Sequence, residues 1–219
     1  YGLGTGTTTA ATDRMTAIAA ANLGLTETNI AVGGTVMERI MDQQVASYEF
    51  RAGDLIAMMC GFNNVRYGGS TEANETSYVT ACTAVLGWMA LPDSKKVFTQ
   101  TDSSTLNPSV TFSGTWAASS NGKGALAQSR AGAVTTVNGA YAQATVTGDT
   151  VYVLISGQNG FTSRVTINID GAVLAPSGVL DVSPWIAVPD GSGQVPQPVL
   201  LRFPGLSAGD HVVRITHAG

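Results

Sequence analysis

Residues 55–64 read Leu-Ile-Ala-Met-Met-Cys-Gly-Phe-Asn-Asn, an apolar run that ends in a glycine and two side-chain amides. A continuous apolar run of this length is typical of a parallel strand that is covered on both faces. We therefore predict a buried strand over residues 54–60. Polar groups that directly follow such a strand lie at the mouth of an α/β sheet, where ligands bind.

Helix and strand signals alternate on both sides of this strand, within residues 1–98. A short apolar segment, residues 29–32, runs into the Gly33-Gly34 turn and is a second candidate strand. Apolar residues at helical spacing predict helices over about residues 12–24, 36–45 and 72–90. The alternating order predicts an α/β three-layer domain, flavodoxin-like in style, with right-handed crossovers.

The pattern changes after residue 98. Polar and apolar residues then alternate with period two, and turn signals such as Gly148-Asp149 and Asp170-Gly171 separate the segments. The predicted strands cover residues 140–147, 151–156, 164–170, 199–203 and 211–216. Short strands so spaced indicate an antiparallel β-sandwich, so we predict two domains, residues 1–98 and 99–219.

Composition excludes several classes of partner. The 219 residues are 44% hydrophobic and 12% charged, and 11 Lys and Arg against 15 Asp and Glu give a net charge of −4. This balance argues against nucleic acid, because nucleic-acid modules carry a basic face. No apolar stretch approaches the roughly 20 residues that span a bilayer. Cys60 and Cys82 lack metal-ligand spacing and are interpreted as free core thiols, with a disulfide as the alternative.

Two segments of the first half resemble blocks of the SGNH (GDSL-type) hydrolases. Gly61-Phe62-Asn63-Asn64 resembles the family's Gly-x-Asn-Asp motif, and residues 29–35 resemble its glycine-bearing second block. The resemblance implies that the Asn63 amide and the Gly34 backbone N–H are oxyanion-hole donors. The alternative for Asn63 is a turn residue that bonds its own backbone, and the alternative for Gly34 is a glycine that relieves turn strain or opens the helix N-terminus. Because Asn64 replaces the family's Asp, we expect a different hydrogen-bond network to hold this loop.

The nucleophile and the general base of this family are not found in the chain. Residues 1–6 are similar to the sequence that follows the family's Gly-Asp-Ser turn, so the serine is expected just upstream of Tyr1. Neither His211 nor His217 has an Asp three residues before it, so the Asp-x-x-His block is expected soon after Gly219. On this interpretation the chain by itself is inactive.

The second half resembles the jelly-roll, carbohydrate-module-like domains that some secreted and phage-tail SGNH esterases carry inside their hydrolase domain. Residues 113–116, 169–171 and 206–211 carry this resemblance. It implies an inserted sandwich in a serine esterase that removes acyl groups, such as acetyl, from a polysaccharide outside the cell or on a virion. It implies no metal and no organic cofactor, and it leaves homo-oligomerisation open.

Three further residues are predicted to contact the substrate. Arg66 and Tyr67 follow the amide pair, and Trp185 lies between Pro184 and Pro189 in a predicted loop. For each of the three, an ordinary surface or core role is the alternative. For the whole chain, the alternative to an esterase is a non-catalytic glycan-binding or structural tail-fibre module.

Overall fold

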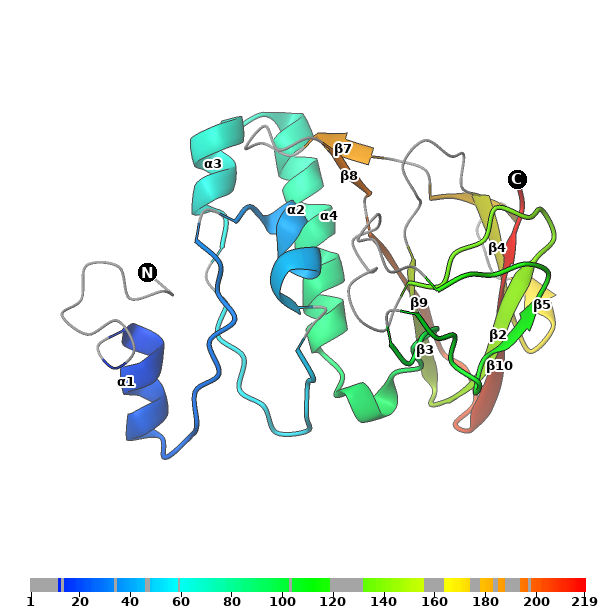
Figure 1. Cartoon of the computed structure of the whole chain (residues 1–219), viewed down its shortest axis with the longest axis horizontal. Coiled ribbons are helices and arrows are strands. Elements are labelled where there is room, and N and C mark those ends of the chain that lie inside the picture. Colours follow the sequence, from blue (N-terminus) through cyan, green and yellow to red (C-terminus); the bar gives the residue numbers. More distant parts are fainter. Residues whose placement is uncertain are drawn as a thin grey trace.

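The computed structural model describes residues 12–219 except 13, 34, 46–47, 59, 103, 119–131, 156–163, 174–177, 183–184, 188–193 and 197. In Figure 1 the helices occupy one side of the molecule and most strands the other, with α4 facing β9 where the two sides meet. We call residues 15–98 the helical region and residues 99–219 the β region.

Short helices build the helical region. They are α1 (Met15–Asn22), α2 (Met37–Ile40) with a π-helical turn η1 (Met41–Val45), α3 (Phe62–Gly68), α4 (Glu72–Met89) and a 3-10 turn η2 (Asp93–Lys95). The long helix α4 starts where Thr71 Oγ1 accepts a hydrogen bond from the Asn74 N–H at 3.3 Å. Glu72 and Glu75 lie in its first turn, where acidic groups offset the helix dipole. The predicted helix over residues 72–90 is thereby confirmed.

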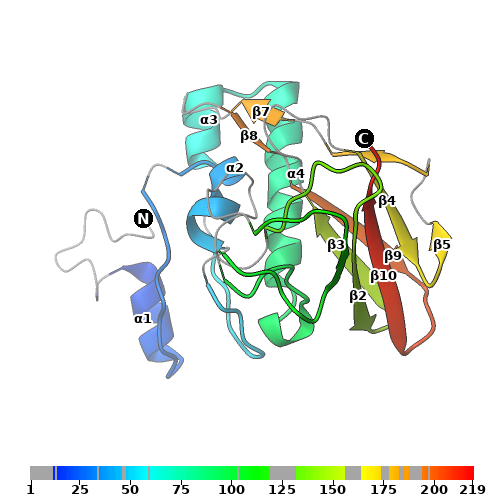
Figure 2. The same ribbon diagram turned by 45° about the vertical axis from the view of Figure 1, so that its right-hand side comes forward.

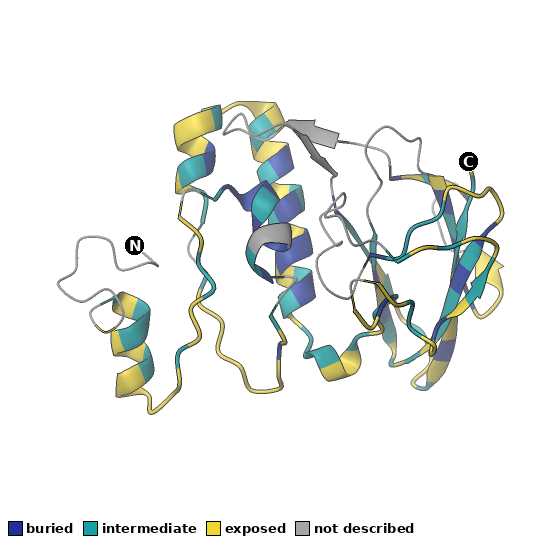
Figure 3. Cartoon of the chain, viewed as in Figure 1, coloured by how far each residue is buried: buried dark blue, intermediate teal, exposed yellow. Residues whose placement is uncertain are grey.

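The core of the helical region lies between α2, η1 and α4. Met37, Met41 and Val85 are almost fully buried, and Trp88 packs edge-on against Phe98 with ring centroids 5.6 Å apart. Figure 3 shows the buried face of α4 turned toward α2. By contrast, α1 contains no buried residue. The apolar face of α1 therefore contributes nothing to this core.

The prediction of an α/β three-layer, flavodoxin-like domain is wrong. The described residues of 54–60 pair with no strand, and Leu55 is 72% and Ile56 41% exposed. Residues 29–32 form no strand either, and every strand pairing in the described part of the chain is antiparallel. A strand requires a neighbour whose N–H and C=O groups complete its ladder, and the described helical region offers none. The described residues of the apolar run 55–60 therefore belong to no strand.

Antiparallel sheets build the β region. The largest has the order β1 (Thr111–Ser113), β2 (Tyr141–Thr147), β10 (Asp210–His217), β4 (Arg164–Ile169) and β5 (Ala172–Val173), and β6 (Leu180–Asp181) also pairs with β4. Figure 2 shows β10 between β2 and β4. Two further pairs are β3 (Thr150–Ile155) with β9 (Val199–Pro204), and β7 (Trp185–Ala187) with β8 (Gln194–Pro196). The five predicted strands are confirmed, and their ends differ by at most one residue.

The β-region core lies between the largest sheet and the β3–β9 pair. Ile167 and Val213 from the first pack with Val153 and Phe203 from the second. Alternate residues of β4 and β10 are buried, as period two requires. The β region is therefore rich in antiparallel sheet and consistent with the predicted β-sandwich, whereas its jelly-roll topology, its insertion and the boundary at residue 98 stay predictions.

Candidate functional site

The structure brings the two family-like segments together. Asn63 lies in the first turn of α3, not at the end of a strand, and its Nδ2 donates to the Thr35 carbonyl oxygen at 3.1 Å. Thr35 follows Gly34 in the sequence, and Gly34 itself lies outside the described residues. The segment that carries the predicted glycine and the segment that carries the predicted amide therefore lie side by side.

A second contact joins the same segments in the interior. The Asn64 side chain, 5% exposed, accepts a hydrogen bond from the Met37 N–H at 2.9 Å and donates to Glu38 Oε2 at 2.6 Å. Ser77 of α4 donates to Glu38 Oε1 at 2.9 Å. Glu38, Asn64 and Ser77 form what we call the buried polar cluster, which links α2, α3 and α4. This cluster is the different network that Asn64 was expected to require.

Sequence reasoning missed Glu38 and Ser77. Glu38 is only 1% exposed, although it stands between Met37 and Arg39 on what reads as an ordinary amphipathic helix. Because charged residues are almost never fully buried unless partnered, a buried acid is an informative observation. The single signal in the sequence was one acid within the apolar segment 36–41.

The Asn63 amide retains donor capacity. A side-chain amide has two N–H donors, and one of them binds Thr35. Among the residues that the structure describes, no acceptor takes the second. Asn63 is half-buried, and its orientation is set by the Thr35 bond. A donor held in this way suits the stabilisation of negative charge on a substrate oxygen.

Gly61, at the N-cap of α3, lies against Tyr78. Its φ of +96° is in the left-handed region that favours glycine, and an added Cβ would lie 3.2 Å from the Tyr78 hydroxyl. Cys60 Sγ lies 3.4 Å from the same hydroxyl. This hydrogen bond to Cys60, together with burial, raises the pKa of Tyr78 to about 12. The phenol is therefore protonated at neutral pH.

Both cysteines are free thiols, as predicted, and both are half-buried. Burial is the main cause that raises the pKa of the Cys82 thiol, with Cys60 as a smaller cause. Since the thiolate is the nucleophilic form, Cys82 is a poor candidate for a catalytic nucleophile.

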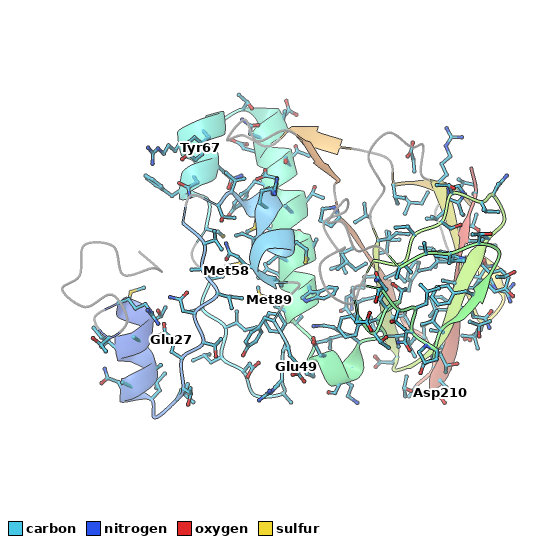
Figure 4. All side chains as sticks on the ribbon, viewed as in Figure 1. Glu27, Glu49, Met58, Tyr67, Met89 and Asp210 are labelled. Atoms are coloured by element: carbon cyan, nitrogen blue, oxygen red, sulfur yellow. The ribbon has the colours of Figure 1, made fainter. Side chains whose placement is uncertain are left out.

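The predicted substrate-contacting residues lie on two elements, α3 and β7. Arg66 and Tyr67 are exposed on α3, and the Arg66 guanidinium carbon lies 5.3 Å from the centroid of the Tyr67 ring. Figure 4 labels Tyr67 on this helix. Trp185 begins strand β7 and does not lie in a loop, and its side chain is outside what the structure describes. Their role in substrate binding stays a prediction.

One histidine is paired with a carboxylate, but the pair is structural. His211 is 3% exposed, and its Nδ1 lies 2.6 Å from Asp170 Oδ2 while its Nε2 lies 2.8 Å from the Ser207 carbonyl oxygen. The hydrogen bond to Asp170 is the largest cause that raises the pKa of His211. Both ring nitrogens lie within hydrogen-bond distance of oxygen atoms inside the fold, and the side chain is buried, so neither nitrogen is available to a substrate. His211 therefore ties the turn after β4 to the turn before β10.

Neither a second histidine paired with a carboxylate nor a metal site is found in the described part of the chain. His217 Nδ1 is buried and has no hydrogen-bond partner among those residues. They contain no group of three or more His, Cys, Asp or Glu side chains that could hold a metal ion. None of the described helices is long and apolar enough to cross a membrane. Comparison with protein-family models, with curated proteins and with solved structures found no match for this chain.

Proposed function

We propose that residues 33–38 and 61–64 form the oxyanion-binding side of a serine esterase that acts on acylated polysaccharide. One observation carries the proposal: the Asn63 amide binds the Thr35 carbonyl at 3.1 Å, which brings together two segments that are 28 residues apart. The buried polar cluster supports it, because it fixes Asn64 against the same segment.

The Asn63 N–H that is not bound to Thr35 would donate to the negative charge that develops on the ester carbonyl oxygen. Such donors act in the transition state more than in the ground state, because the oxygen gains charge only as the ester is attacked. The described residues contain no serine paired with a histidine base. The proposal therefore assigns to this chain the charge-stabilising part of the reaction and leaves the attacking serine to be located by labelling.

The test uses the full-length natural polypeptide. Hydrolysis of p-nitrophenyl acetate and of acetylated xylan is measured for the wild type, Asn63→Ala and Asn138→Ala. Asn138 is an exposed turn residue and serves as the matched control. Loss of one oxyanion donor is expected to lower kcat by about 10²–10³ with little change in KM.

Stability must be controlled, because Asn63→Ala also removes the bond to Thr35, with a net contribution of about 1 kcal/mol. Assays therefore run well below the melting temperature of every variant. An inactive wild type, or an Asn63→Ala variant as active as the wild type, would overturn the proposal.

A second function is favoured by the two hydrogen bonds of His211, which engage both ring nitrogens and withdraw this histidine from the role of general base. It is a non-catalytic glycan-binding or structural tail-fibre module. A fluorophosphonate that labels activated serines separates the two functions, since only the esterase forms a covalent serine adduct. Retention on polysaccharide without an adduct would favour the binding module.

A further inference from the structure

We infer that Glu38 is a positioning residue for Asn63: the Glu38 carboxylate holds Asn64, and through it the start of α3, in the orientation that presents the neighbouring amide. This inference rests on the proposed function. It adds a residue for which no direct contact with substrate is proposed.

The first step of the argument is that α3 depends on tertiary bonds for its orientation. The helix has seven residues, and its N-cap, Gly61, makes no side-chain capping bond. A helix this short is marginal by itself. Its first turn is instead held by two successive amides, Asn63 on the Thr35 carbonyl and Asn64 on the Met37 N–H.

The second step is that Glu38 determines which way the Asn64 amide faces. Asn64 Oδ1 must face the Met37 N–H, so Nδ2 must face an acceptor, and Glu38 Oε2 supplies it at 2.6 Å. The other carboxylate oxygen accepts from Ser77, so both oxygens of this 1% exposed side chain are used. Each of the three side chains in the cluster therefore has a hydrogen-bond partner.

The third step concerns why an acid is present there. A buried acid contributes less to stability than apolar residues of similar volume often would, because its desolvation is costly. Glu38 contacts groups on α3 and α4 while it belongs to α2. A polar group that joins three elements through directional bonds specifies geometry, which is what a preorganised donor such as Asn63 requires.

The test exchanges acid and amide between positions 38 and 64 in the full-length polypeptide. Asn64→Asp places two carboxylates against each other, and we expect kcat to fall by about 10²-fold, as a misplaced catalytic geometry does. Glu38→Gln is expected to have a small effect, because the Ser77 hydroxyl can reverse its role and accept from the new amide. In the double variant, the glutamine amide introduced on α2 donates to the aspartate introduced on α3. That aspartate still accepts from the Met37 N–H, so kcat should recover while KM changes little in any variant.

A matched control is Glu75→Gln, which changes an exposed carboxylate on α4 that accepts from Ser70 Oγ at 3.0 Å. It should leave kcat unchanged and lower the melting temperature only slightly, because it removes one acidic group from the first turn of α4. If Asn64→Asp does not fold, recovery of folded protein in the double variant supports the inference, and a double variant that also fails to fold overturns it.

A second readout is independent of catalysis. The side-chain amide resonances of Asn63, observed by NMR with 15N-asparagine labelling, should move in Asn64→Asp and return in the double variant. If the wild type proves inactive, the proposed function fails, yet this resonance cycle still decides the role of Glu38. A double variant that restores neither kcat nor the Asn63 resonances, or an Asn63 resonance unmoved by Asn64→Asp, would overturn the inference.

Discussion

The helical region and the β region differ in the side chains that fill their cores. In the β region, apolar side chains of β4 and β10 alternate regularly into one core, and the His211–Asp170 pair lies at the end of the sheet. The helical region instead carries the buried polar cluster inside its packing. The core of the β region therefore follows the period-two alternation of its strands, whereas the core of the helical region also contains polar side chains that bond one another.

The largest expected effect tests whether the two regions unfold together or separately. Ile167, fully buried in β4, belongs to the β-region core. Ile167→Ala should lower the free energy of unfolding by about 2–5 kcal/mol, because it removes buried methylenes and leaves a cavity. Hydrogen exchange should then accelerate in β10 more than in α4. Val212→Ala, on the exposed face of β10, is the control at about 0.5 kcal/mol, and equal acceleration in both regions would contradict separate cores.

The next effect tests the contact between the regions. Gly87 in α4 faces Leu200 of β9, whose side chain an added Cβ would overlap. A glycine-to-alanine change normally stabilises a helix, but Gly87→Ala should destabilise the protein by about 1–3 kcal/mol through overpacking. Thermal melts of Gly87→Ala, Leu200→Ala and the double variant should be non-additive. Additive shifts would mean that the two side chains do not meet.

A smaller effect concerns pH and the β region alone. The pKa of His211 is raised, first by its bond to Asp170, so its contribution is complete below about pH 6.5 and is lost as pH rises through its folded pKa. The pKa of Asp170 is lowered, first by the same bond, so its contribution is lost as pH falls through its folded pKa. The contribution of this pair to stability should therefore decline both as the pH rises through the folded pKa of His211 and as it falls through the folded pKa of Asp170.

Asp170→Asn isolates this pair, since asparagine tolerates the φ of +52° at that position. Melting temperatures of the wild type and the variant, measured from pH 5 to pH 9, should converge as the pH rises. Parallel curves over that range would show that the pair does not contribute in this way.

The smallest expected effect tests the finding that the segment around Leu55 is not a buried strand. Leu55 is 72% exposed, so Leu55→Asp should change the free energy of unfolding by no more than about 0.5 kcal/mol. Val85→Asp, at a fully buried position of α4, is the contrasting control and should prevent folding. A large loss of stability in Leu55→Asp would restore the buried strand that the sequence predicted.

The β strands could be predicted closely because the alternation of polar and apolar residues and the turn glycines are both local features of the sequence. Helix α4 was predicted for the same reason, since the helical spacing of its apolar residues is a local feature of the sequence. The apolar run 55–60 misled because an unbroken apolar segment indicates burial but does not supply the neighbouring strands that a sheet requires. The fold class of the helical region depended on those missing partners.

The sequence by itself determined that two successive amides follow Gly61 and that strands fill the second half. Only the tertiary structure decided that Asn64 is buried on Glu38 while Asn63 keeps one N–H, because those bonds join residues 26 and 28 positions apart. The Ser77 bond to Glu38 spans 39 positions. Periodicity records which side chains are apolar within one element, whereas the pairing of polar groups depends on which elements meet.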